Sequence, residues 1–180
     1  MEQECQADLR ALLDKDAIRD CLYRYCRGID RADEELLRSV YWPDAHDCHG
    51  AYVGSASGFI DQAVPRLRSG GRGVHQISNV LIELHGDAAA VESGFLALQT
   101  NAAAPTLETF LCGRYLDRFE RRGVQWRIAE RTVVYDWIEE RSRAELAQQD
   151  SDLFAQRQPT GARSPSDPVY GFLERLRQRP

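Results

Sequence analysis

Four long segments with the period of β-strands fill the second half of the chain and constrain its fold most strongly. They cover residues 73–84, 89–101, 107–121 and 124–138. Only short turns separate them, such as Gly86-Asp87 and Arg122-Gly123. Because strands joined by tight turns pair as antiparallel neighbours, we predict one curved antiparallel sheet.

The first seventy residues have helical periodicity instead. Apolar side chains recur at three- and four-residue spacing over residues 14–30, which predicts an amphipathic helix with Asp16 as its N-cap. We expect a short helix over 33–41, a strand over 46–53 and a third helix capped by Ser55. Helices that precede a sheet indicate an α+β fold and not alternating βαβ units.

After Glu139 the composition changes. Residues 140–157 are charged and helix-prone, a loop rich in Pro, Gly and Ser follows, and residues 169–177 have the pattern of a last helix. We therefore predict one domain over residues 1–140 and a helical, partly flexible tail over 141–180.

The composition excludes several classes of function. The net charge is −5, which argues against a nucleic-acid partner. No run of about 18 apolar residues exists, so no membrane span is expected, and the acidic N-terminus does not resemble a secretory signal. Five scattered cysteines without a Cys-x-x-Cys pair fit free thiols in the cytoplasm. Without a Gly-rich phosphate loop, we expect no nucleotide or flavin cofactor.

Asp30 and His75 are the strongest candidates for catalysis. Asp30 ends the first helix on the same apolar stripe as Cys26, and His75 opens the first long strand. A carboxylate that orients and charges an imidazole makes a minimal general base. The alternatives are a helix-end carboxylate exposed to water or bonded to Arg31, and a structural histidine on the strand.

The order of the elements, with Asp30-x-x-Asp33 closing the first helix and His75-Gln76 opening a long strand, resembles the SnoaL-like branch of the nuclear transport factor 2-like superfamily. The resemblance covers about residues 8–140. It implies a cone-shaped α+β barrel, in which N-terminal helices pack on the curved sheet around an apolar pocket. Within the branch, scytalone dehydratase, hexachlorocyclohexane dehydrochlorinase and bile-acid 7α-dehydratase are most similar, and the resemblance implies their Asp/His pair at Asp30 and His75.

Tyr25 and His49 are further candidates. The resemblance to the bile-acid enzyme implies a catalytic hydroxyl at Tyr25, although core packing is an equal alternative. The dehydratases carry a tyrosine where this chain has His49, and we expect His49 to line the pocket. A metal site built from His46 or His49 is disfavoured, because no diagnostic ligand spacing is present.

Four more residues are candidate substrate contacts. Asn79 has an amide that can bind a carbonyl, and Arg131 can anchor a carboxylate or carbonyl through two hydrogen bonds. Structural roles, including a cross-strand ion pair for Arg131, are the alternatives. Tyr41 and Trp42 are aromatic side chains that either pack in the core or line the pocket mouth.

These observations predict a cofactor-free lyase or isomerase, dehydratase-like, acting on a small hydrophobic cyclic molecule such as a steroid, terpenoid or aromatic polyketide. The alternative is a non-catalytic protein, either a ligand-binding protein or an assembly subunit resembling the small β subunit of aromatic-ring dioxygenases. We expect a cytoplasmic homo-oligomer, dimer or trimer, with Trp126, Ile128 and Val134 supplying the contact on the outer face of the sheet.

Overall fold

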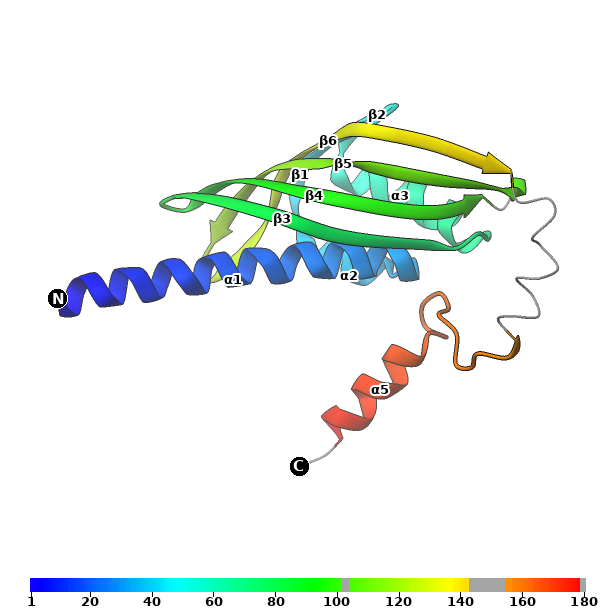
Figure 1. The fold of residues 1–180 in the computed structure, drawn as a ribbon. Helices are drawn as coiled ribbons and strands as arrows, with labels where there is room; N and C mark the ends of the chain where they lie inside the picture. Colours follow the sequence, from blue (N-terminus) through cyan, green and yellow to red (C-terminus); the bar gives the residue numbers. More distant parts are fainter. Residues whose placement is uncertain (102–103, 143–154, 179–180) are drawn as a thin grey trace.

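The structure, a computed structural model, describes residues 1–101, 104–142 and 155–178 (Figure 1). Helices and a curved sheet form two layers, and the described part of the chain contains these elements in order: α1 (Glu2–Arg31), α2 (Glu34–Val40), β1 (Tyr41–His49), β2 (Tyr52–Ser55), α3 (Ala56–Arg68), β3 (Gly73–His85), β4 (Ala88–Asn101), β5 (Ala104–Arg122), β6 (Gln125–Ser142) and α5 (Pro168–Arg177). The α+β prediction is confirmed.

The sheet is mixed and open. Its strand order is β2-β1-β6-β5-β4-β3, and β3 to β6 form the predicted antiparallel meander. The predicted antiparallel pairing of these four strands is confirmed, and the sheet as a whole is mixed because β1 pairs with β6 in parallel. The chain leaves β1 through β2 and α3 and then starts β3 at the opposite edge. Since no pairing joins β2 to β3, these strands do not close into a barrel.

The helix boundaries differ from the prediction at the N-terminus. Helix α1 begins at Glu2, so Asp16 lies inside the helix and is not its N-cap. Ser55 caps α3 as expected, since its hydroxyl accepts a hydrogen bond from the Gly58 N–H. The single strand expected over 46–53 is two antiparallel strands, because a turn at Gly50, where φ is +65°, divides it.

The core lies between the helices and the facing side of the sheet. Helix α1 supplies Ile18, Leu22 and Ile29 from one stripe, which pack against the sheet along β3. Trp126 and Ile128 are buried in this core, and the Trp126 indole N–H donates to Asp14 at 2.8 Å. The prediction that these two side chains supply an outer oligomer contact is therefore wrong.

The last described segment packs against the end of α1. Asp167 caps α5 by accepting from the Val169 N–H, and its carboxylate also forms an ion pair with Arg31 at 2.9 Å. The Tyr170 hydroxyl donates to Asp33 at 2.6 Å. The last helix is thus confirmed, whereas most of the helix-prone stretch 140–157 lies outside the described residues. In the described part of the chain, no helix combines the length and apolarity needed to cross a membrane.

Candidate functional site

Asp30 and His75 form a hydrogen-bonded pair. Asp30 lies in the last turn of α1 and His75 near the start of β3, where α1 covers the strand. Asp30 Oδ1 lies 2.7 Å from His75 Nδ1, and Oδ2 accepts from the His75 backbone N–H at 3.0 Å. Both side chains are only 12 % exposed. Since both carboxylate oxygens are bonded to the same residue, the imidazole has a fixed position and Nε2 is the ring nitrogen left for other partners.

A cavity of about 360 Å³ lies beside this pair, between the end of α1, helix α3 and the sheet. Its apolar wall consists of Ile29, Phe59, Ala63 and Leu67, and its polar lining includes Tyr25, His49, His75, Gln99, Thr100 and Thr109. Cavities of roughly 300–1,000 Å³ with apolar walls and a few polar groups are typical of small-molecule sites. The cavity therefore has the size and lining to hold a small, largely apolar molecule next to the His75 imidazole.

His49 is the second histidine of the cavity. It ends β1, and its ring stacks on Phe59 with centroids 4.4 Å apart. Its Nδ1 is buried and lies 3.4 Å from Oδ1 of Asp47. Asp47 is itself fully buried and accepts from the Tyr41 hydroxyl at 2.7 Å. The cavity thus contains two histidines, each with a carboxylate beside its Nδ1.

Tyr25 forms the floor of the cavity and rests on a buried ion pair. Arg131 donates from Nε and Nη2 to the two oxygens of Asp117, both at 2.7 Å, and neither side chain is exposed. The Arg131 guanidinium lies between the rings of Tyr25 and Tyr115, 4.0 Å from each centroid. Tyr25 is therefore held from below by a charged side chain at van der Waals distance.

Burial controls the protonation of Tyr25 and of the ion pair beneath it. Burial raises the pKa of Tyr25, and the nearby Arg131 charge only partly opposes it, so the hydroxyl keeps its proton. Burial also raises the pKa of Asp117 against the opposing effect of Arg131. Burial alone would lower the pKa of Arg131, but the Asp117 charge holds it well above its usual range. Tyr25 consequently remains neutral beside the cavity.

The structure brings Asp30, His75, Tyr25 and His49 together, but it does not bring the other four predicted residues to the cavity. Asn79 is exposed on a bulge of β3, with φ at +47°, where the pairing with β4 shifts. Trp42 donates its indole N–H to the Glu120 carbonyl and lies between two arginines of the opposite end of the sheet.

Tyr41 and Arg131 lie beneath the cavity and not on its surface. Tyr41 is buried against Asp47, and Arg131 forms the cross-strand ion pair that the sequence left open as an alternative. Both side chains are therefore placed to support Tyr25 and His49 and not to contact a substrate directly.

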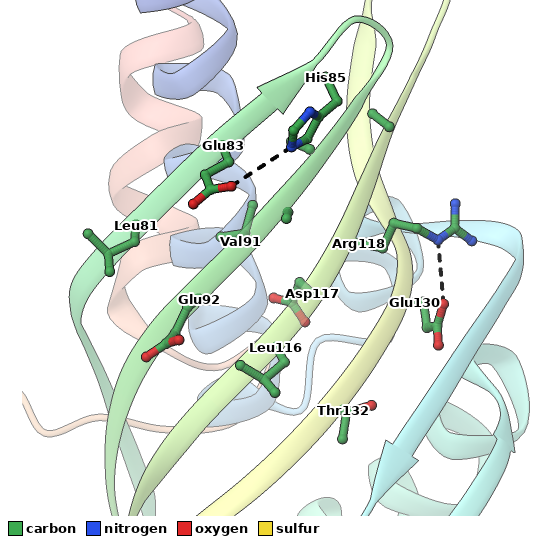
Figure 2. A pocket seen from close by; sticks show the side chains of 13 residues that line it. Leu81, Glu83, His85, Val91, Glu92, Leu116, Asp117, Arg118, Glu130 and Thr132 are labelled. Atoms are coloured by element: carbon green, nitrogen blue, oxygen red, sulfur yellow. Dashed lines mark hydrogen bonds and ion pairs between the residues drawn. The ribbon is translucent and has the colours of Figure 1, made fainter.

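A larger hollow of about 620 Å³ lies on the outer face of the sheet (Figure 2). The outward side chains of β3 to β6 line it, among them Leu81, Glu83, His85 and Arg118. Its histidine is 67 % exposed and lies 3.9 Å from Glu83, which is 80 % exposed. Because water screens so open a pair, this hollow does not favour proton transfer, and the smaller inner cavity is the better candidate site.

Sequence reasoning missed three features of the site. Phe59 and Asp47 hold His49, but helical and strand periods show only that they face inward. Arg163 reaches the cavity from the tail, and no local pattern indicates that contact. Within the described segments, no three His, Cys, Asp or Glu side chains gather closely enough to hold a metal ion.

The geometry agrees with a family comparison. The model of the SnoaL-like domain matches residues 10–132. The chain belongs to the SnoaL-like domain family. The match ends before the last residues of β6 and before the tail. No curated protein matches the sequence.

Solved structures share the fold. A hexachlorocyclohexane dehydrochlorinase, LinA type 2, is 22 % identical with a TM-score of 0.68, over 75 % of this chain and 93 % of its own. A candidate scytalone dehydratase from Novosphingobium aromaticivorans is 18 % identical with a TM-score of 0.65, over 72 % of this chain and 88 % of its own. The beta subunit of a candidate aromatic-ring-hydroxylating dioxygenase from the same organism is 22 % identical with a TM-score of 0.57, over 72 % of this chain and 93 % of its own. The fold therefore occurs in proteins named for elimination reactions and in a protein named as an oxygenase subunit.

Proposed function

We propose that this chain is a cofactor-independent lyase or isomerase that acts by His/Asp general acid–base catalysis. The observation that carries the proposal is the 2.7 Å contact between Asp30 and His75 at the edge of a cavity with one apolar wall. The substrate class is a small hydrophobic cyclic molecule, such as a steroid, terpenoid or aromatic polyketide. The named elimination enzymes among the structural neighbours support the same class of chemistry.

In this mechanism, Asp30 accepts the Nδ1–H of His75, so that the lone pair of Nε2 faces the substrate as a base. His75 removes a proton from carbon, and the Asp30 carboxylate stabilises the resulting imidazolium. The electron pair of the broken C–H bond then forms a double bond. In a lyase, a leaving group departs with its own electron pair; in an isomerase, the proton returns to another carbon.

Tyr25 and His49 hold the oxygen of the substrate. The Tyr25 hydroxyl, which burial keeps protonated, donates to a carbonyl or to a departing hydroxyl. The His49 ring lies on the cavity wall with its Nδ1 toward Asp47, which leaves Nε2 to contact the same oxygen. Exclusion of water by the apolar wall strengthens these contacts.

Turnover in D₂O tests the proposal. A panel of cyclic hydroxyketones and halides is incubated with the protein, and mass spectrometry detects loss of water or halide and uptake of deuterium at carbon. General acid–base groups contribute about 10²–10⁴-fold, so His75→Gln should lose at least 10²-fold. His85→Gln, an exposed histidine on the same strand, is the matched control and should keep the wild-type rate. A His75→Gln variant as fast as this control removes His75 from the mechanism.

The alternative is a non-catalytic assembly subunit. The dioxygenase beta subunit among the neighbours supports it, as does the outer sheet face, where several large apolar side chains are exposed: Val74, Leu81, Leu96, Leu98 and Leu116. Recovery of a stoichiometric large subunit with the tagged chain would favour this alternative. A monomeric or self-associating chain that turns over substrate would exclude it.

A further inference from the structure

The last turn of α1 carries Asp30, and it ends in an uncommon way. The last four carbonyls of a helix have no partner inside it and must find one elsewhere. Ala32, in the left-handed conformation with φ at 50°, donates its N–H to the Ile29 carbonyl at 3.2 Å. The Asp33 N–H donates to the Gly28 carbonyl at 2.9 Å. This local turn therefore satisfies the first two of the four carbonyls.

The tail satisfies the other two. Nη1 of Arg163 donates to the Asp30 carbonyl at 2.5 Å, and the backbone N–H of Ser164 donates to the Arg31 carbonyl at 2.6 Å. A cationic donor at the C-terminus of a helix also interacts favourably with the helix dipole. A segment more than 130 positions away in the chain thus completes the cap of the turn that holds the candidate catalytic carboxylate.

The same guanidinium also reaches the approach to β3. Nη2 of Arg163 donates to the Gly71 carbonyl at 2.9 Å, and β3 starts two residues later on the way to His75. Because a guanidinium is planar and presents its donors in a rigid fork, it fixes the separation of the two backbones that it joins. Arg163 therefore links the end of α1, with Asp30, to the start of the strand that carries His75.

The tail has further contacts that do not involve Arg163. Asp167 forms its ion pair with Arg31 at 2.9 Å, and the Tyr170 hydroxyl donates to Asp33 at 2.6 Å. Both contacts lie on the far side of the α1 cap from Gly71. Docking of the tail and the Arg163 bridge can therefore be perturbed separately.

We propose that Arg163 is a positioning residue for the Asp30–His75 pair. Its bridge holds α1 and β3 at the separation at which one carboxylate reaches both Nδ1 and the backbone N–H of His75. The inference rests on the proposed function only for its effect on catalysis. Arg163 lies outside residues 10–132, which match the SnoaL-like domain, so the tail adds this contact to the matched domain.

Hydrogen exchange of the His75 backbone N–H tests the proposal, because this group donates to Asp30 at 3.0 Å and exchanges when the pair opens. In full-length Arg163→Gln, NMR should show exchange at least about tenfold faster, equivalent to about 1.4 kcal/mol. Arg163→Lys keeps a cationic donor and should restore part of the protection. The Trp126 indole N–H, bonded to Asp14 in the first half of α1, should exchange at the wild-type rate.

Tyr170→Phe is the matched control. It removes one contact of the tail and leaves both hydrogen bonds of Arg163 intact, so exchange at His75 should match the wild type. An unchanged His75 N–H in Arg163→Gln would overturn the proposal. Equal acceleration in Tyr170→Phe, or of Trp126 in Arg163→Gln, would also overturn it, because the effect would then come from tail docking or from overall stability.

This experiment needs no substrate, so the inference and the proposed function can fail separately. If Arg163→Gln accelerates exchange but His75→Gln keeps the wild-type turnover, the bridge stands and the proposed chemistry fails. If turnover needs His75 but exchange in Arg163→Gln is unchanged, the reverse holds. When both stand, Arg163→Gln should also slow turnover, since a displaced catalytic group can cost up to about 10²-fold in rate.

Discussion

Asp117→Asn tests the buried ion pair that supports the cavity floor. The carboxylate accepts two hydrogen bonds of 2.7 Å from Arg131, and both side chains are fully buried. An asparagine turns one acceptor into a donor that faces the guanidinium, and it leaves the Arg131 charge without its partner. Breaking a buried pair in this way costs about 3–5 kcal/mol. Since Asp47 lies beside Arg131 in the β1–β6 pairing, we expect a cost near 3 kcal/mol, the lower end of that range.

Urea unfolding followed by tryptophan fluorescence measures this loss in the free energy of unfolding. Asp136→Asn is the matched control, because Asp136 accepts from Arg114 on the exposed face and such pairs contribute at most about 1 kcal/mol. Replacing both partners, Asp117→Leu with Arg131→Met, should cost less than Asp117→Asn because it leaves no orphaned charge. A loss below about 1 kcal/mol for Asp117→Asn, equal to the control, would refute this reasoning.

Three further predictions concern packing and protonation. Gly113→Ala should destabilise the fold by about 1–3 kcal/mol in urea unfolding, because the new Cβ overlaps the Val134 carbonyl, while Gly73→Ala, with open space around it, should be near neutral. Burial raises the pKa of Cys21 and Cys26 to about 12, so at pH 8 Ellman's reagent should leave both unmodified in the native chain and react with them in urea. The buried thiols also make the free energy of unfolding depend on pH. Their contribution is complete below about pH 9, the pKa of a thiol in the unfolded chain, and it is lost as the pH rises toward 12. Equal stability at pH 8 and pH 10.5 would contradict it.

The sequence predicted the elements better than the faces of the strands. On β3, strict alternation puts His75 with Asn79 and Leu81, and it mixes apolar and polar residues on both faces. The bulge at Asn79 explains the mixture. Before the bulge, the odd-numbered residues His75 and Ile77 face the core; after the bulge, Val80 and the following even-numbered residues face it. A bulge depends on the partner strand, so a single strand's pattern does not reveal it.

Long-range contacts were the other part that sequence reasoning could not supply. The family resemblance placed Asp30 opposite His75, and the structure brings the two within 2.7 Å. Asp117, by contrast, meets Arg131 only through the register of β5 and β6, which turn geometry and two bulges determine together. Arg163 meets Asp30 across 133 positions of the chain, a contact that local periodicity does not encode.

The tautomer of His75 tests the central claim most directly, and it needs no substrate. Long-range ¹H–¹⁵N NMR spectra distinguish a protonated from an unprotonated ring nitrogen, and His75→Gln assigns the signals. Asp30 as the orienting carboxylate predicts neutral His75 with its proton on Nδ1 and a bare Nε2, and Asp30→Asn should disturb this state. A wild-type His75 with its proton on Nε2, or one unchanged in Asp30→Asn, would contradict the account.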